Sequence, residues 1–490
     1  MQGDLNLVDL LNMVVETAGD RVTVGSKADG YTNSDLKLRA EQGAAMLSEH
    51  GAKVVIYLAM MHQCFPVAIF ASAAAGVPFI PLNYRLSDDQ LGALLAKHPD
   101  PLVITDDSQR LIALGVDQVN IYGPDEWLLA CTESALQPLP RVEPESIAVL
   151  LYTSGTTSEP KAVVLRHKHL VAYIQSSIPF ASANEDSAAL ISVPPYHIAG
   201  VANSITSIYS TRRVVYLPVF DPNIWLGLIR SENITHAFLV PTMLARVVYV
   251  LGDSSAECPS LQVLSYGGAR MPITVLERAL RAFPDAGFAN AYGLTETSST
   301  LAMLTPDDHR AALTGDPKAR ARLGSAGKIV PGIEVEIRDG EIWARGKQVS
   351  GEYLGQTRGL ESGEWFYTRD RGWIDEDGYL FIEGRTDDTI IRGGENIAPA
   401  EIEDALLRHP DVVDAAVVGV PDDEWGQRIE AAVVLSPGAQ ADTEQLRNHC
   451  RGLLRSSKTP DRIVIRESLP HTDTGKLLRR QVLADLMSAN

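Results

Sequence analysis

Cysteine and basic residues are both scarce in this sequence. The 490 residues include only four cysteines, all far apart, and none has a Cys or His at metal-ligand spacing. So few cysteines favour a reducing compartment over a disulfide scaffold. The formal net charge of −19 excludes the broad basic surface that a nucleic-acid partner requires, although one local lysine suffices for a nucleotide ligand.

Long apolar runs are also lacking, with one exception. Residues 64–82 carry no charge and are numerous enough to span a bilayer. Their three prolines, one glycine and many alanines favour instead a buried helix followed by a buried strand, and we expect no membrane span. No basic region precedes the first apolar residues, so we expect no secretory signal and a cytoplasmic location.

Apolar, β-branched runs alternate with helical patterns through most of residues 1–384. This alternation predicts a large α/β body in which helices cover several sheets. The predicted strands lie at residues 53–60, 101–105, 147–152, 213–219, 236–240 and 261–266. The predicted helices between them lie at residues 89–98, 223–232 and 274–283.

The pattern changes after residue 384, where a short charged stretch, "RTDD", reads as a linker. Beyond it we expect a small α+β domain. Its predicted helices lie at residues 399–410, 442–454 and 477–487, and its strands at 412–420, 429–435 and 462–465. The predicted organisation is therefore a large N-terminal domain at 1–384, a hinge at 385–388 and a small C-terminal domain at 389–490.

The stretch "YTSGTTSEPKAVV" (residues 152–164) has the composition of a phosphate-binding loop. Gly155 lets the backbone approach a ligand closely, and Lys161 adds a positive charge. It is not a Walker A loop, because no G-K-[ST] is present and the segment after Lys161 reads as a strand. A polar hairpin turn is the alternative. Hydroxyl donors come from Thr153, Ser154, Thr156 and Thr157.

Four further stretches, in order, favour phosphate binding. They are "NAYGLTET" (290–297), "YTRDRGWIDEDGYL" (367–380), "GRTDDTIIRGGENIAPAEIE" (384–403) and "PHTDTGKLLRR" (470–480). Together with the loop, they resemble in order and spacing the adenylate-forming superfamily, which includes acyl-CoA synthetases, luciferases and the adenylation domains of peptide synthetases. The resemblance covers essentially the whole chain. It implies a large adenylation domain joined by a hinge to a small mobile domain.

The resemblance also implies nucleotide contacts in the large domain. Glu296 corresponds to the Mg²⁺ ligand, Thr295 to a contact with the α-phosphate, and Tyr292 to the residue that stacks on adenine. One carboxylate suffices for Mg²⁺ when phosphate oxygens complete its shell. Further nucleotide contacts are implied at Asn290, Gly293, Gly268, Ala269 and Arg270.

Other implied roles lie toward the C-terminus. Asp370 would take the ribose hydroxyls, Arg385 would contact the ribose, and Asp387 would be the hinge residue. Gly394 would line the tunnel for the acceptor thiol, and Lys476 would enter the active site as the catalytic lysine. Each of these side chains, taken alone, could equally be a solvated surface group.

The sequence departs from the family pattern at four positions. Arg369 stands where the family usually has glycine, Arg270 replaces a common proline, and Ser158 and Ala162 replace glycines of the first loop. The hydroxyls and the lysine of that loop remain. The turn beside Asp370 is the feature that these departures make least certain.

The segment "PPYHIAG" (194–200) resembles the part of the family that shapes the acyl pocket. Relatives that activate amino acids carry an Asp near His197, and none is present here, which disfavours a substrate amine. No Arg or Lys follows until Arg212, which disfavours a second carboxylate. The alternative is that His197 is a buried core histidine whose hydrogen bonds are made within the protein. The predicted pocket residues are Tyr196, His197, Val201, Thr242, Tyr266, Gly267 and Leu294.

The sequence therefore predicts an acid–thiol ligase that uses ATP, Mg²⁺ and coenzyme A. It would convert a fatty, aryl or alicyclic acid to an acyl-adenylate, release pyrophosphate, and pass the acyl group to the CoA thiol. Loading of a carrier-protein pantetheine is the first alternative. A non-catalytic nucleotide sensor and a phosphotransferase that releases ADP are the others.

Overall fold

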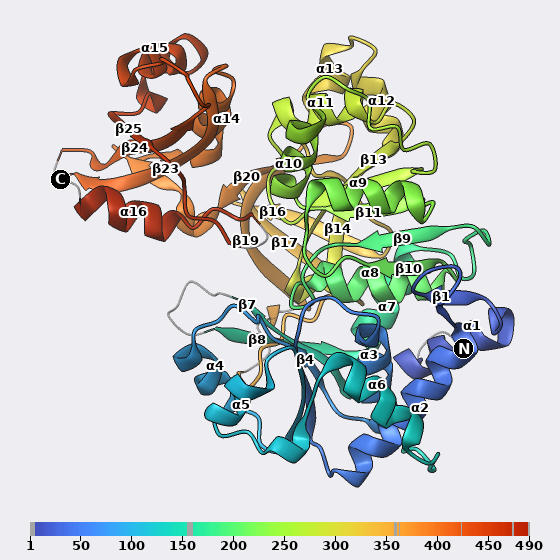
Figure 1. Ribbon diagram of the computed structural model, residues 1–490. Helices are drawn as coiled ribbons and strands as arrows, with labels where there is room; N and C mark the ends of the chain where they lie inside the picture. The colour runs from blue at the N-terminus through green and yellow to red at the C-terminus, as the bar shows by residue number, and fades with distance from the viewer. Residues whose placement is uncertain are drawn as a thin grey trace.

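In the computed structural model, a sheet of fourteen strands runs through the large body (Figure 1). The structure describes residues 5–153, 160–356, 360–361, 363–422, 424–472 and 475–488. One half of this sheet is a parallel block, with an antiparallel β2 (Tyr31–Thr32) at its edge. In spatial order the parallel strands are β1 (Val22–Val24), β10 (Arg213–Tyr216), β9 (Ala188–Ile191), β11 (His236–Leu239), β12 (Val263–Gly267) and β13 (Gly287–Leu294).

The other half of the sheet is antiparallel and continues from β13. In spatial order its strands are β14 (Ser299–Leu304), β15 (Gly327–Ile329), β20 (Tyr379–Arg385), β19 (Trp365–Ile374), β17 (Glu341–Gly346) and β16 (Ile333–Arg338), with β18 (Leu360–Glu361) paired to β19.

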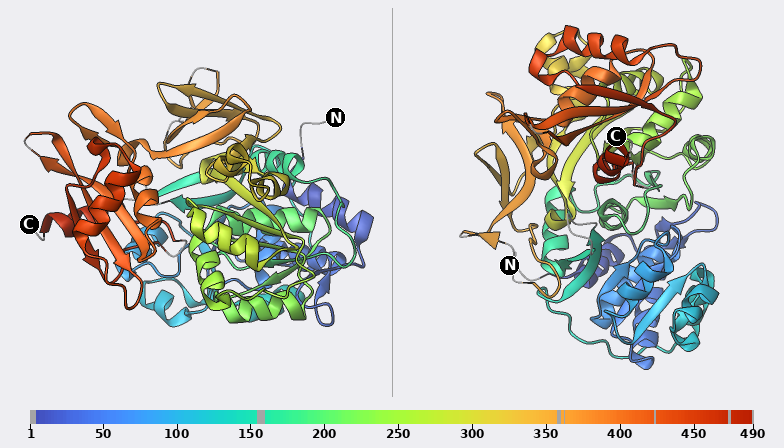
Figure 2. Two further views of the ribbon diagram at one scale, coloured as in Figure 1. Left: turned by 90° about the horizontal axis from the view of Figure 1, so that it is seen from above. Right: turned by 90° about the vertical axis from the view of Figure 1, so that its left-hand side faces the viewer.

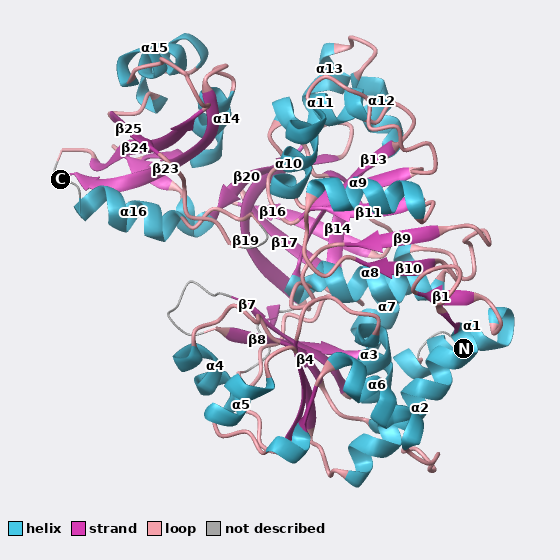
Figure 3. Ribbon diagram, viewed as in Figure 1, coloured by secondary structure: helices cyan, strands magenta, loops and turns pink. Residues whose placement is uncertain are grey.

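A second sheet of six strands lies beside the first. Alternate residues of β3 belong to two cores: Val55 and Tyr57 to the largest one, Ile56 and Leu58 to a smaller one with Leu91 of α4. Helices accordingly cover both faces, with α4 and α5 on one side and α2, α3 and α6 on the other (Figure 3). The strand order is β6 (Ile121–Tyr122), β5 (Pro101–Thr105), β3 (Val54–Leu58), β4 (Phe79–Pro81), β7 (Ile147–Thr153) and β8 (Lys161–Arg166).

Several helices of the large body begin at a residue whose side chain caps the first turn. In α2, for example, the Thr32 hydroxyl accepts from the Asp35 amide at 3.1 Å, and the Asp35 carboxylate accepts from the Thr32 amide at 2.9 Å. The helices are α1 (Leu7–Ala18), α2 (Asn33–Glu49), α3 (Cys64–Ala75), α4 (Asp88–Leu95), α5 (Ser108–Ala113), α6 (Pro124–Glu133), α7 (His167–Ser177), α8 (Ile198–Tyr209), α9 (Pro222–Ser231), α10 (Pro241–Leu251), α11 (Ile273–Ala282), α12 (Pro306–Ala312) and α13 (Pro317–Arg322). Single 3₁₀ turns are η1 (Gln118–Asn120) and η2 (Thr295–Thr297).

The uncharged stretch at residues 64–82 is the predicted buried helix and strand, α3 and β4. Residues 64–74 are all buried in α3, because alanines let it lie close to its neighbours. Its left-handed C-cap, Gly76, ends the helix. None of the helices in the described ranges is long and apolar enough to cross a membrane.

A smaller lobe follows η3 (Thr386–Asp388), and we call residues 389–488 the small lobe and residues 5–384 the large lobe. Seen from above, it projects on the side away from the N-terminus (Figure 2). Its strands are β21 (Ile390–Arg392), β22 (Glu395–Ile397), β23 (Val412–Asp422), β24 (Gly426–Leu435) and β25 (Arg462–Arg466). Its helices are α14 (Pro399–Leu407), α15 (Thr443–Leu453) and α16 (Arg479–Ser488), with the 3₁₀ turn η4 (Ser456–Lys458).

The predicted α/β body with a smaller α+β lobe is confirmed. The predicted helix at residues 399–410 ends earlier, at Leu407, since Pro410 disfavours helical backbone at the residue before it. The small lobe has core clusters of its own, built from residues between Ile390 and Leu486. The hinge at residues 385–388 stays a prediction.

Stability of the large lobe should depend on pH through His167, which is 1% exposed. Its Nδ1 accepts from the Leu7 amide at 3.3 Å, and burial lowers its pKa to about 4. Below about pH 6.5 the unfolded chain binds a proton that the folded chain does not bind until about pH 4. The free energy of unfolding should therefore fall as pH drops through this window, by roughly 3 kcal/mol for this residue.

Urea unfolding between pH 7 and pH 4 measures this slope. His167→Gln should flatten it, whereas the same change at the exposed His50 should not. An unchanged slope in the His167 variant would contradict the assignment.

Candidate active site

The carboxyl ends of the parallel strands place the predicted site residues along one edge of the large sheet. His197 follows β9, Thr242 follows β11, Gly268 follows β12, and Glu296 follows β13. Parallel strands all end at the same edge, so residues distant in sequence meet there. The sheet topology thus explains why the predicted residues gather.

A buried carboxylate, Asp370, lies on β19 in the antiparallel half of the sheet. Asp370 is 6% exposed and receives hydrogen bonds from the Tyr292 hydroxyl at 2.6 Å and from Arg385 Nη1 at 3.1 Å. Asp370 and Arg385 are register partners in β19 and β20. Burial raises the pKa of Asp370, and the charge of Arg385 opposes that shift. Each carboxylate oxygen keeps a second lone pair, so the group can still accept from the two hydroxyls of a ribose.

The neighbouring Arg369 has a φ of +63°, in the left-handed region that favours glycine. This is one of the four positions at which the sequence departs from the family pattern. The pairing of β19 with β20 is also irregular here, because its register shifts between Arg371 and Gly372. The turn is therefore formed with arginine in place of glycine, and Asp370 keeps its partners.

Glu296 and the phosphate loop are linked by one tyrosine. The Tyr353 hydroxyl donates to Glu296 Oε1 at 2.7 Å, and the Lys161 ammonium lies 5.5 Å from the centroid of the Tyr353 ring. The backbone of this segment also bonds both elements, since Ser350 donates to the Glu296 carbonyl and Leu354 to the Ala162 carbonyl. The segment after β17 therefore fixes Glu296 relative to the start of β8.

Glu296 fits a magnesium ligand in chemistry. Its Oε1 accepts from the Tyr353 hydroxyl, and among the described residues no donor contacts Oε2. Within the described ranges, no group of three or more His, Cys, Asp or Glu could hold a metal ion, so a cation here would need phosphate and water oxygens. Mg²⁺ has this coordination when it is bound together with a nucleotide.

Glycines at this edge let neighbouring strands approach each other closely. A Cβ on Gly267 would lie 2.3 Å from the Ala291 carbonyl oxygen, and one on Gly293 would lie 1.6 Å from the Ser299 oxygen. Both glycines are therefore required by β12, β13 and β14. Gly268 has a φ of +84°, and its Cβ position lies 3.8 Å from His197 Nε2.

His197 caps α8 and is held neutral. Its Nδ1 accepts from the Ala199 amide at 3.2 Å, so the remaining proton belongs on Nε2, on the Gly268 side. Burial lowers its pKa to about 4, and the charge of Lys476 acts in the same direction. A neutral imidazole with an Nε2 donor is therefore present at this edge.

Lys476 reaches this edge from the small lobe. Its amide donates to Thr472 Oγ1 at 3.0 Å, which closes a turn next to α16. Gly475, with a φ of +75°, lies so close to α10 that a Cβ there would be 2.2 Å from Thr242 Oγ1. Lys476 is an exposed residue, yet surrounding protein and Arg385 lower the pKa of its ammonium, while Asp370 and Asp388 act to raise it. The turn thus places a cation within electrostatic reach of Asp370 and His197.

The remaining predicted residues fall into three groups. Asn290 donates to the Ser325 carbonyl at 3.3 Å, Leu294 is half-buried at the end of β13, and Ala269 and Tyr196 are half-buried at the edge. Tyr266 and Val201 have no exposed surface, and the Tyr266 hydroxyl pairs with His309 at 2.9 Å, so their side chains face the core. Thr153 pairs with Lys161 at the ends of β7 and β8, as expected, while Ser154, Gly155, Thr156 and Thr157 lie outside the described residues.

Three further predicted residues come from the nucleotide, hinge and thiol sets. Arg270 forms an ion pair with Asp404 of α14. Asp387 lies in η3, between the lobes. Gly394 is exposed in the turn between β21 and β22, with no described atom within 4 Å of its Cβ position. The structure therefore brings Lys476, and not Gly394, to the sheet edge.

No sequence motif indicates that Tyr353, Tyr84 or Arg85 belongs to this region. The Tyr84 ring meets the Tyr196 ring edge-on at 5.7 Å, and the Arg85 guanidinium lies 5.5 Å from the Tyr84 centroid. These residues are distant in sequence from the motifs they support. Only the tertiary structure shows that they belong to the same region.

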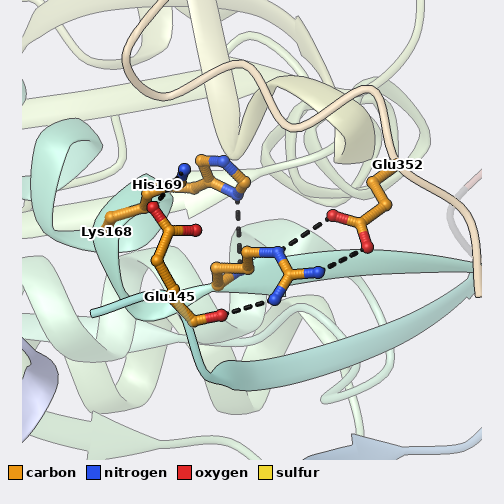
Figure 4. Close-up of a pocket in the computed structure, with 5 residues that line it drawn as sticks. Glu145, Lys168, His169 and Glu352 are labelled. Carbon is orange, nitrogen blue, oxygen red and sulfur yellow. Dashed lines mark hydrogen bonds and ion pairs between the residues drawn. The ribbon is translucent and has the colours of Figure 1, made fainter. Parts of the chain in front are cut away.

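A cavity of about 420 Å³ lies at the far end of β8 (Figure 4). Its charged groups are already paired, with Arg166 bound to Glu352 at 2.6 Å and Lys168 to Glu145 at 2.7 Å. Arg166 lies five residue steps along the extended strand from Lys161, or ~17 Å. It is therefore distinct from the edge that holds Lys476 and Glu296.

Comparison with known proteins agrees with this arrangement. Residues 12–354 match the family described as AMP-binding enzyme, and residues 401–476 match the AMP-binding enzyme C-terminal domain. The chain is 34% identical over 486 residues to a sulfoacetate–CoA ligase of Cupriavidus necator, covering 95% of this chain and 93% of that protein. It is 31% identical over 452 residues to a fatty acid–[acyl-carrier-protein] ligase of Streptomyces coeruleorubidus, covering 87% and 86%.

Among solved structures, the O-succinylbenzoate coenzyme A synthetase of Bacillus subtilis in complex with ATP and magnesium ion is similar. Its TM-score is 0.83 at 27% identity, covering 98% of this chain and all of that one. The chain belongs to the AMP-binding enzyme family of adenylate-forming acid–CoA ligases.

Tyr353→Phe should weaken the use of Mg²⁺ because it removes the hydroxyl that orients Glu296. Loss of such an orienting partner typically costs about 10- to 100-fold in metal affinity. Calorimetric titration of ATP at a series of Mg²⁺ concentrations should show a half-saturating Mg²⁺ concentration about tenfold higher. Binding of ATP without metal should be unchanged.

Tyr367→Phe is the matched control, since that hydroxyl donates to Glu341 at 2.8 Å and not to Glu296. Equal Mg²⁺ dependence in both variants would remove Tyr353 from this role.

Proposed function

We propose that this protein activates a carboxylic acid with ATP, releases pyrophosphate, and transfers the acyl group from the acyl-adenylate to the thiol of coenzyme A. The observation that supports this most directly is the position of Lys476. A turn of the small lobe lies against Thr242 and carries its ammonium to the edge that bears Asp370 and Glu296. A cation delivered there suits a reaction that builds negative charge on phosphorus.

In the first half-reaction the substrate carboxylate attacks the α-phosphorus, and the bond to pyrophosphate breaks. Negative charge grows on the five-coordinate phosphorus and on the leaving group. Lys476 stabilises it as a cation fixed in advance, in surroundings that screen charge less than bulk water does. Thr295, which begins η2 beside Glu296, would donate to an α-phosphate oxygen.

The nucleotide would be held by both sheets. Asp370 and Arg385 would bind the ribose, and Tyr292, Gly268 and Ala269 would lie along the adenine. Mg²⁺, held by Glu296 and phosphate oxygens, would supply further positive charge. The first loop would surround the polyphosphate with donors from Thr153, Ser154, Gly155, Thr156, Thr157 and Lys161.

In the second half-reaction the thiol attacks the acyl carbon and AMP departs. The small lobe would turn about Asp387 in η3, so that Lys476 withdraws and the turn at Gly394 takes its place. Domains 1–384 and 389–490 would move as two bodies about residues 385–388. Gly394, with a φ of +82°, leaves room for a pantetheine arm.

The acid we propose is fatty, aryl or alicyclic, without a free amine. His197 is neutral and offers an Nε2 donor, so it neither pairs with an ammonium as Asp would nor supplies a permanent cation for a second carboxylate. Tyr196 adds an aromatic wall, and Thr242 bounds the pocket on the side of the small lobe.

An acid with a second anionic group is the other candidate, and Arg85 favours it. Its guanidinium lies over Tyr84, whose ring contacts Tyr196, so it is a cation near the proposed pocket. The relative from Cupriavidus necator is named for sulfoacetate, which carries such a group.

The acceptor is also open to test, because the relative from Streptomyces coeruleorubidus is named for acyl-carrier protein.

A panel of acids with ATP tests the function and the acid together. We expect AMP and a thioester to form with neutral-tailed acids and CoA, and amino acids to give neither. Formation of ADP would indicate a phosphotransferase, and absence of ATP–pyrophosphate exchange with every acid would indicate a nucleotide sensor. The second candidate would be supported if the protein prefers a dianionic acid and Arg85→Ala abolishes that preference. Replacing CoA with a holo-carrier protein tests the acceptor.

Lys476→Ala should separate the half-reactions. Loss of one fixed donor to the transition state typically costs about 100- to 1,000-fold, so ATP–pyrophosphate exchange should fall by this factor. Conversion of supplied acyl-adenylate to thioester should persist, because Lys476 is absent from the site in that step. Arg480→Ala, an exposed cation at the start of α16, is the control. Equal loss of both half-reactions would overturn the proposed role.

A further inference from the structure

An ion pair joins residues of the two lobes beside the proposed site. Arg270 Nη2 contacts Asp404 Oδ2, and the two residues are 134 positions apart in sequence. Arg270 follows β12 in the large lobe, and Asp404 lies in α14 of the small lobe. Both side chains keep partial access to solvent, at 45% and 33% exposure. The contact is therefore a reversible one at the boundary between the lobes.

The same orientation of the small lobe seats Lys476. Gly475 approaches Thr242 too closely for any side chain, so the turn lies directly on the first residues of α10. Within the small lobe, Arg479 bonds Glu403 at 2.6 Å, and Glu403 also accepts from the Val417 amide at 2.8 Å. The base of the Lys476 turn is thus tied to α14, the helix that carries Asp404.

We propose that the Arg270–Asp404 ion pair positions Lys476 for acyl-adenylate formation and breaks before thiol transfer. This inference rests on the proposed function, in which the small lobe turns between the half-reactions. Arg270 belongs to the large lobe and cannot follow α14 through that turn. The ion pair therefore stabilises the first orientation alone, and its loss shifts the population toward the second.

A contact between Arg270 and the nucleotide, which the family resemblance implies, makes a different prediction. A nucleotide contact would not depend on the residue at position 404, whereas an ion pair does.

Charge reversal is the sharpest test. A partly exposed ion pair contributes modestly, so Arg270→Ala should lower ATP–pyrophosphate exchange by about two- to fivefold. Arg270→Glu places two carboxylates together and should lower it further, by about tenfold. Single-turnover conversion of supplied acyl-adenylate to thioester should be unchanged or faster in both variants. The loss in exchange should shrink as ionic strength rises, because salt screens exposed charges.

The double variant Arg270→Glu with Asp404→Arg should recover most of the exchange rate, since it restores the pair with opposite polarity. Arg320→Glu is the matched control: Arg320 pairs with Glu277 at 2.6 Å, and both residues belong to the large lobe. It should change neither half-reaction.

Two results would overturn the proposal. One is a raised KM for ATP in Arg270→Glu that Asp404→Arg does not correct, which assigns Arg270 to the nucleotide instead. The other is an equal loss of both half-reactions in Arg270→Glu. Failure of the proposed function itself would look different, because the unaltered protein would then give neither exchange nor thioester.

Discussion

The arrangement depends on one electrostatic interaction, between the ammonium of Lys476 and the charges on the carboxyl edge of the large sheet. The surrounding protein and Arg385 lower the pKa of the ammonium, while Asp370 and Asp388 act to raise it. A cation in such surroundings is screened less than one in bulk water, so its effect on a phosphate is larger. The features that hold the small lobe in place, from the Gly475 contact to the Arg270 ion pair, serve this interaction.

The large lobe supplies the complementary half through topology. Parallel strands β9, β11, β12 and β13 end at one edge, and the antiparallel strands beyond them add Asp370 and Arg385. The second sheet contributes β7 and β8, whose connection is the proposed phosphate loop. The segment around Tyr353 joins the two sheets, through its bridge to Val163 and its hydrogen bond to Glu296. Site geometry is therefore a property of how the sheets meet.

Much of this could be predicted from sequence because the signals are local. The strand at 101–105 matches β5 residue for residue, and the buried helix at 64–75 follows from its alanines and lack of charge. Glu296 and Asp370 were predicted from ordered motifs around them. The family and the two-lobe fold are confirmed, while the roles of individual residues stay predictions.

The rest required the tertiary structure. Tyr353 and Glu296 are 57 residues apart, and each is a common residue type with no distinguishing neighbours. Tyr266 was expected in the acyl pocket from its place beside Gly267, but strand residues alternate in direction, and its hydroxyl pairs with His309 in the core. Arg85 was not predicted because only the tertiary structure brings it near Tyr196. Its guanidinium lies over the Tyr84 ring, and that ring contacts Tyr196.

The small lobe has hydrophobic clusters drawn wholly from its own residues, and this has an evolutionary consequence. Recombination between homologous genes within the codons for residues 386–389 would exchange one lobe while leaving both cores intact. Selection would then act chiefly on the few contacts across the boundary. An ancestral large lobe could in this way keep its preferred acid while acquiring a partner lobe suited to a different thiol.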